Sequence, residues 1–115
     1  MTSNPLFDSW ESVRKYALTL PDAKPASASV KVQGKAFVYT GREKGSFCVR
    51  SPLDEKEMLM LTDPDTFWES PHYSGWPAVL VRFGSPDRER IERVICRAWW
   101  ERASDAQRKQ FGPRP

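Results

Sequence analysis

The chain has 115 residues, with a formal net charge of +3 at pH 7 and 39% hydrophobic residues. This length predicts one domain with a single core, and a content of five Trp and six Phe excludes a disordered protein. No apolar run reaches the roughly 18 residues of a membrane-spanning helix. The first ten residues, MTSNPLFDSW, lack the basic and apolar regions of a signal peptide. We therefore expect a cytoplasmic protein that makes no contact with a membrane.

The first predicted element is a helix that begins at Asn4-Pro5, with Asn4 as its N-cap and Pro5 in its first position. An apolar stripe follows at helical spacing and is expected to face the core. The stripe consists of Leu6, Trp10, Val13, Ala17 and Leu20. Pro21-Asp22 ends the helix.

A β-hairpin is predicted next, with strands at 30–32 and 35–40 around a two-residue Gln33-Gly34 turn. Strict alternation places Phe37 and Tyr39 on one face of the second strand. A third strand at 46–50 completes an antiparallel meander. In it, Phe47 and Val49 face away from Cys48 and Arg50.

The middle of the chain predicts a short helix at 54–61, in which Met58, Leu59 and Leu61 are candidates for burial. Residues 66–69 form either a turn or a short edge strand. Residues 78–83 are a buried strand bounded by Pro77 and Gly84. Its Val79, Val81 and Phe83 share the face that a helix covers.

The longest predicted helix follows, with Ser85 as N-cap and Pro86 in the first helical position. An apolar stripe runs along it and predicts packing on the sheet. Its members are Ile91, Val94, Ile95, Ala98 and Trp99. Ser104 can cap a last helical turn through Gln110, and residues 112–115 are expected to fray.

These elements predict an α+β two-layer sandwich, in which helices cover one face of an antiparallel sheet. The expected order is α-β-β-β-α-β(β)-α. The whole chain, 1–115, forms one domain with a core at about 5–104 and a tail at 105–115.

Positive charge gathers in two regions, and this distribution favours an anionic partner. The hairpin region contributes Lys31, Lys35, Arg42 and Lys44, and the outer face of the last long helix contributes Arg90, Arg93, Arg97 and Trp100. Cations beside an aromatic ring suit phosphates and stacked bases. The alternative is that these charges are solvated and that the C-terminal tail, through Phe111, covers Trp100.

A cluster of aromatic residues surrounds the only histidine and could line a shallow pocket for a planar ligand or a peptide. The cluster consists of Trp68, His72, Tyr73 and Trp76. The alternative is that these rings cap one end of the core and that His72 bonds a loop backbone. No nucleophile motif, phosphate loop or dinucleotide fingerprint accompanies His72. We therefore expect a protein that is not an enzyme and carries no cofactor.

Cys48 and Cys96 are the only cysteines, and they form no CxxC motif. With one histidine and two distant thiols, no zinc site is expected. Free buried thiols in a reducing compartment are favoured over a disulfide.

In order and spacing, several segments resemble the MmcQ/YjbR family of small bacterial proteins, a domain of unknown function. The segments are KVQGKAF at 31–37, the acidic helix ending in Asp63-Pro64, His72-Tyr73 with Gly75-Trp76, VLVR at 79–82 and the region of Trp99. The resemblance spans about residues 10–104. It implies one domain with a central antiparallel sheet and a layout like that of secretion chaperones. It also implies DNA binding, a label that rests on fold analogy. Before the hairpin this chain has DAKPASAS, where family members often carry a longer stretch with an acidic residue and Gly-x-Pro.

Together these observations favour a DNA-binding module that contacts phosphates through the basic hairpin and the last long helix. Two alternatives stay open. One is a chaperone-like module that binds a protein partner or forms a homodimer through a sheet edge or the Trp100 surface. The other is a small-ligand binder around His72.

Overall fold

The computed structural model describes residues 5–115, and its framework is one antiparallel sheet of six strands. The strand order across the sheet is β1-β2-β3-β4-β6-β5. The strands are β1 (Lys24–Pro25), β2 (Ser29–Val32), β3 (Lys35–Thr40), β4 (Ser46–Arg50), β5 (Phe67–Trp68) and β6 (Ala78–Arg82). The two edge strands, β1 and β5, have two residues each, and such short edges limit pairing with other chains.

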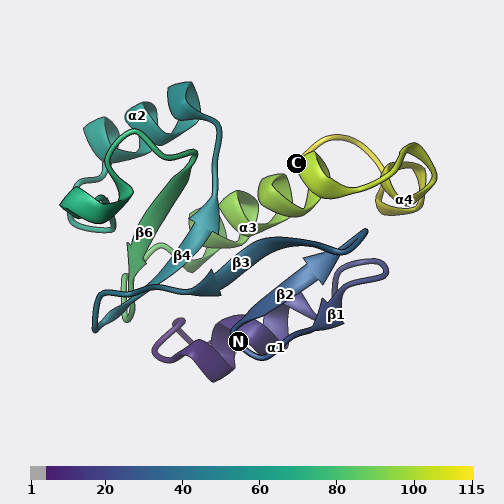
Figure 1. Ribbon diagram of the computed structural model, residues 1–115, viewed down its shortest axis with the longest axis horizontal. Helices are drawn as coiled ribbons and strands as arrows, with labels where there is room; N and C mark the ends of the chain where they lie inside the picture. Colours follow the sequence, from purple (N-terminus) through teal and green to yellow (C-terminus); the bar gives the residue numbers. More distant parts are fainter. Residues whose placement is uncertain (1–4) are drawn as a thin grey trace.

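Four helices accompany the sheet: α1 (Trp10–Ala17), α2 (Leu53–Thr62), α3 (Arg88–Arg102) and α4 (Asp105–Phe111). A 3₁₀ turn, η1 (Pro71–Tyr73), precedes β6. Figure 1 shows α1 and α3 on the same side of the sheet, α2 beyond the ends of β4 and β6, and α4 past the end of α3. The predicted α+β fold is confirmed, with β1 added to the expected order and the predicted last helical turn present as α4.

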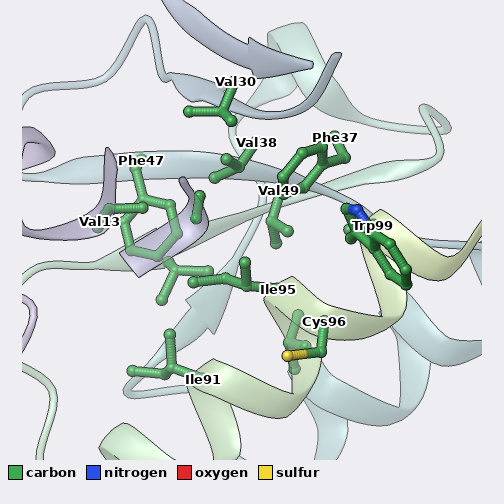
Figure 2. Close-up of a cluster of buried hydrophobic side chains, with 14 of the residues drawn as sticks. Val13, Val30, Phe37, Val38, Phe47, Val49, Ile91, Ile95, Cys96 and Trp99 are labelled. Atoms are coloured by element: carbon green, nitrogen blue, oxygen red, sulfur yellow. The ribbon is translucent and has the colours of Figure 1, made fainter. Parts of the chain in front are cut away.

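The main core lies between α3 and the sheet. In Figure 2, Ile91, Ile95 and Trp99 project from α3 towards Val38 and Val49 of the central strands. All five side chains are fully buried. Burying an aliphatic side chain of this size contributes about 1.5–3 kcal/mol. The predicted apolar stripe of the last long helix is therefore confirmed.

The hairpin between β2 and β3 turns through Gln33 and Gly34, as predicted. Both residues have positive φ, 54° and 72°, which matches a two-residue turn with left-handed centres. Gly34 adopts this conformation without strain.

A β-bulge changes which side chains of β3 face the core. The pairing of β2 with β3 shifts register and skips Phe37. Phe37 and Val38 are therefore both buried in the main core, and Tyr39 packs against the cluster on the opposite face. The predicted strict alternation, with Phe37 and Tyr39 on one face, is wrong because the bulge adds a residue.

The first helix begins later than predicted, at Trp10 instead of Pro5. Ser9 caps it through a capping box with Ser12, in which each side chain accepts the other's backbone N–H. Residues 5–8 are not helical, and there Phe7 is buried while Leu6 is exposed. The predicted cap at Asn4 lies outside the described residues.

The start of α3 also differs from the prediction. The helix begins at Arg88, and the Asp87 side chain accepts a backbone N–H of the first turn. Ser85 donates its hydroxyl to the Arg82 carbonyl instead, at 2.8 Å. Ser85 and Pro86 therefore belong to the turn after β6, because Ser85 is bound back to the strand end.

Helix α2 buries different residues from those predicted. Of the three apolar candidates only Leu59 is buried, whereas Met58 is 56% and Leu61 79% exposed. Lys56 is buried in their place, with 2% exposure. The side of the helix that faces the interior therefore carries a lysine, and two large apolar side chains lie on the surface.

The C-terminal segment packs on the domain. Ser104 caps α4, as predicted, and the Phe111 ring lies 5.2 Å from that of Trp99, centroid to centroid. The expected fraying of 112–115 is wrong: Arg97 Nε donates to the Pro115 backbone oxygen at 3.0 Å, and Arg114 pairs with acidic side chains of α2 and α3.

Candidate functional site

A groove of about 610 Å³ lies over β2 and β3. On β2, Val30 and Val32 are buried in the main core, so Lys31 between them points to the other face of the sheet. Lys31 and Tyr39 both line the groove, together with residues 26–29, Trp76 and Arg102. The groove is therefore on the sheet face that α1 and α3 leave open.

Cationic side chains border this groove. Lys31 and Lys35 are exposed on the hairpin, and Arg102 reaches the same site from the end of α3 by donating Nε to the Ala36 carbonyl at 3.3 Å. Burial, and then the nearby charge of Arg50, lowers the pKa of Arg102. Among residues 5–115, none of those that line the groove is acidic. The groove is therefore an electropositive hollow.

The edge of the sheet adds a further cation. Lys24 of β1 stands directly opposite Lys31 in the antiparallel pairing, so both side chains point to one face. Like charges in such a cross-strand position destabilise a sheet. A bound anion would remove this repulsion.

Aromatic rings accompany the cations. Trp76 lines the groove and is 52% exposed. Its ring is flanked by His72 and Tyr73, at centroid distances of 5.6 and 6.3 Å. Tyr39 is half-buried beside it, and burial, followed by contact with Cys48, raises the pKa of its phenol. The groove thus presents a neutral phenol and a largely exposed indole.

Buried Lys56 holds the loop that carries Trp76. Its Nζ donates to the carbonyl oxygens of Tyr73 and Trp76, at 2.8 and 2.9 Å. The same atom lies 2.8 Å from Glu69 Oε2 in an ion pair. A positive φ of 78° at Gly75 lets the chain turn between the two anchored carbonyls.

The other predicted hairpin cations lie at the far end of β3. Arg42 and Lys44 are exposed in the turn between β3 and β4. Arg42 Nη1 lies 3.1 Å from His72 Nδ1, and the Arg42 backbone N–H donates to the Tyr73 hydroxyl at 3.2 Å. His72 thus contacts a guanidinium, and the predicted hydrogen bond to a loop backbone is not among those of the described residues.

The arginines of α3 lie elsewhere. Arg90, Arg93 and Arg97 line a separate hollow of about 220 Å³ between α2 and α3, which Glu55 also lines. Arg90 donates Nη2 to Thr62 Oγ1 at 2.6 Å. Because α3 turns its opposite side to the sheet, the structure does not bring these arginines together with Lys31 and Lys35.

The remaining predicted site residues are divided as well. Phe111 and Arg108 cover the Trp100 ring, at 6.2 and 5.3 Å from its centroid, as the alternative for this residue proposed. Trp68 donates Nε1 to Ser46 Oγ at 3.0 Å and packs with buried Tyr73 in the core cluster of the open face. Of the aromatic cluster around His72, Trp76 opens onto the groove.

The sequence of this chain is similar to that of a known protein family. A family model described as YjbR matches residues 17–101. The chain belongs to the YjbR family. The match includes the groove residues at 26–40 and Trp76, and it ends just before Arg102.

Three similar proteins come from mycobacteria and are each described as uncharacterized. They belong to Mycobacterium bovis and to the CDC 1551 and H37Rv strains of Mycobacterium tuberculosis. Each is 36% identical over 44 residues, which is 38% of this chain and 34% of the relative. The matched segment therefore spans about a third of these relatives' length. No solved structure matches the chain.

Sequence patterns missed two residues that line the groove in this YjbR-family protein, Tyr39 and Arg102. The bulge that turns Tyr39 outward leaves no mark in the alternation of β3. The sequence patterns also missed Lys24, which stands opposite the groove residue Lys31 in a strand pairing that the sequence did not predict. Arg102 looked like an ordinary cation at a helix end.

The described part of this YjbR-family protein contains neither a cluster of metal-ligating side chains nor a membrane-spanning helix. Within residues 5–115, no three His, Cys, Asp or Glu side chains are grouped to hold a metal ion. No helix there is both long enough and apolar enough to cross a bilayer. Cys48 and Cys96 are free and buried, as predicted.

Proposed function

We propose that this YjbR-family protein is a non-enzymatic module that binds DNA through the open face of its sheet. Lys31, Lys35 and Arg102 would contact phosphates. The observation that carries the proposal is the groove itself, where these three cations meet exposed Trp76 and no acidic residue of 5–115 is part of the lining. The only histidine of the sequence, His72, contacts the Arg42 guanidinium and the Tyr73 ring.

Charge supplies the free energy of the proposed binding. The Lys24–Lys31 pair is unfavourable in the free protein, and phosphates would relieve it. Each phosphate that is neutralised also releases condensed counterions. Three such contacts predict that affinity falls about 20- to 40-fold between ~50 and ~200 mM salt.

The test is a salt titration of binding to a fluorescent oligonucleotide. Lys31→Ala/Lys35→Ala should weaken binding and reduce the slope of log affinity against log salt by about 1.4–1.8. The matched control, Lys15→Ala/Lys109→Ala, removes the same charge from exposed lysines of α1 and α4 and should leave the slope unchanged. Failure of the unmodified protein to bind at ~50 mM salt would contradict the proposal.

An exposed apolar surface favours a second candidate, contact with another protein chain. Leu53, Met58 and Leu61 of α2 are all at least half exposed, and exposed apolar clusters mark interaction sites. A sheet edge is disfavoured because the edge strands β1 and β5 have only two residues each. The Trp100 surface is disfavoured because Phe111 covers its ring. Light scattering should then show a dimer that Met58→Glu/Leu61→Glu converts to a monomer, and a protein that is monomeric before substitution would count against it.

A further inference from the structure

The inference concerns the form of nucleic acid that the groove accepts, and it rests on the function proposed above. We propose that the groove binds a single strand, with a base stacked on the indole of Trp76 and phosphates on Lys31, Lys35 and Arg102. The strand would run over β2 and β3, where Tyr39 forms part of the floor.

The exposed indole favours a single strand over a duplex. In a duplex the faces of each base are covered by its neighbours, so an indole can stack only on a base that has left the stack. Proteins that recognise the sequence of a DNA duplex insert a helix or a two-stranded β-ribbon into its major groove. Here the cations line a hollow instead, together with residues 26–28 and Trp76.

The stacking surface is held in place before any ligand binds. Lys56 anchors the carbonyl oxygen of Trp76, and the rings of His72 and Tyr73 flank the indole. A side chain that is already ordered loses little conformational freedom on binding. This arrangement explains why a lysine is buried in α2: it fixes the loop that presents the indole.

The dimensions of the groove set the length of the ligand. Its volume is about 610 Å³, on a domain whose longest extent is 39 Å. Single-strand sites on OB-fold domains cover roughly 4 to 16 nucleotides, and we expect a groove of this volume to hold a number at the low end of that range. The groove walls contain small and hydroxyl side chains at 26–29, which contact a backbone without selecting a base.

The test compares two probes with the full-length protein at ~50 mM salt: a single-stranded thymidine oligonucleotide of ~12 nucleotides and a DNA hairpin duplex of the same total charge. We expect the single strand to bind at least about tenfold more tightly, since one stacked base supplies that factor. A uridine oligonucleotide of equal length forms a third arm. If the uridine strand binds as tightly as the thymidine strand, the groove accepts single-stranded RNA as well as single-stranded DNA, and the inference stands.

Variants at position 76 give the second readout. Trp76→Ala should weaken single-strand binding roughly tenfold or more and leave duplex binding unchanged, while Trp76→Phe should restore most of the affinity. Half-exposed Trp76 lies outside the main core, so circular dichroism should show both variants folded. Equal affinity for single strand and duplex, or no effect of Trp76→Ala, would overturn this inference and leave the proposed DNA binding intact. No binding of any probe would overturn both.

Discussion

The buried ammonium of Lys56 donates a hydrogen bond of 2.9 Å to the carbonyl oxygen of Trp76, twenty residues further along the chain. The bond joins α2 to the loop before β6, and a second one, to the Tyr73 carbonyl, fixes the loop at another point. The position of the exposed indole therefore depends on a lysine that no ligand would touch.

Replacing this lysine should loosen the loop and destabilise the fold. Lys56→Met replaces the aliphatic part of the side chain and removes the ammonium, which leaves two carbonyls unbonded and Glu69, 31% exposed, unpaired. Breaking a buried pair from one side costs about 3–5 kcal/mol. Because Glu69 retains some water contact, we expect a loss of about 3 kcal/mol in the free energy of unfolding, measured by urea denaturation.

A matched control separates this effect from loss of charge. Lys44→Met removes an exposed lysine from the turn after β3 and should change stability by less than about 0.5 kcal/mol. Single-strand affinity should fall in the Lys56 variant and hold in the control. Equal urea midpoints for the two variants would mean that the buried bonds are not needed to hold the loop.

Ionisation of the Cys48 thiol should make the stability of the protein depend on pH. Burial raises the pKa of this thiol from 9.0 to about 11. Below pH 9 the thiol is protonated in both states, so its contribution to stability is complete. Between about pH 9 and about pH 11 the unfolded chain loses the proton first, so the free energy of unfolding should fall by about 2 kcal/mol.

The comparison that isolates this thiol is Cys48→Ala, measured by urea denaturation across the same pH range. Its stability should fall less steeply than that of the unmodified protein, although Tyr16 and Tyr39, whose pKa values are also raised by burial, still contribute in the same direction. Parallel curves for the two proteins would show that the Cys48 thiol ionises equally easily in both states.

The docked C-terminal segment predicts a stability cost when its anchor is removed. Phe111 packs on both Trp99 and Trp100 but is only partly buried. Phe111→Ala should therefore cost about 2 kcal/mol, below the 3–5 of a fully buried Phe, with a lower thermal midpoint by calorimetry. Lys109→Ala, on the same helix but exposed, is the control. An unchanged midpoint in Phe111→Ala would mean that α4 does not stabilise the domain.

Local patterns predicted the parts of the fold that local physics decides. The stripe of α3 and the alternation of β4 depend on one apolar face each, and both are as expected. The Gln33-Gly34 turn follows from the need for positive φ in a two-residue hairpin. Ser104 caps α4 because its hydroxyl meets a free backbone N–H of the first turn.

Features that depend on distant partners could not be predicted in this way. Lys56 is buried because loop carbonyls seventeen and twenty residues away accept its hydrogens. Helix α1 starts at Trp10 because Phe7 fills the core from a non-helical segment, whose Phe7 carbonyl accepts the Gly84 backbone N–H. Neither contact is visible in the residues next to the one concerned.

The candidate site was predicted in part for the same reason. Lys31 and Lys35 follow from the hairpin alone, and they line the groove. Arg102 and Trp76 join them through the packing of α3 and the anchored loop, and the outer arginines of α3 face the other way for the same reason. The charge pattern of the sequence thus indicated that cationic residues form the site, and the tertiary packing determines which of them lie together.

The most direct test of the binding groove is a ¹⁵N chemical-shift titration of the protein with a single-stranded thymidine oligonucleotide. Shift changes should concentrate at residues 26–40 and at the indole N–H of Trp76, and they should fade as salt rises. Changes confined to Arg90, Arg93 and Arg97 on the outer face of α3, or no changes at low salt, would contradict the account.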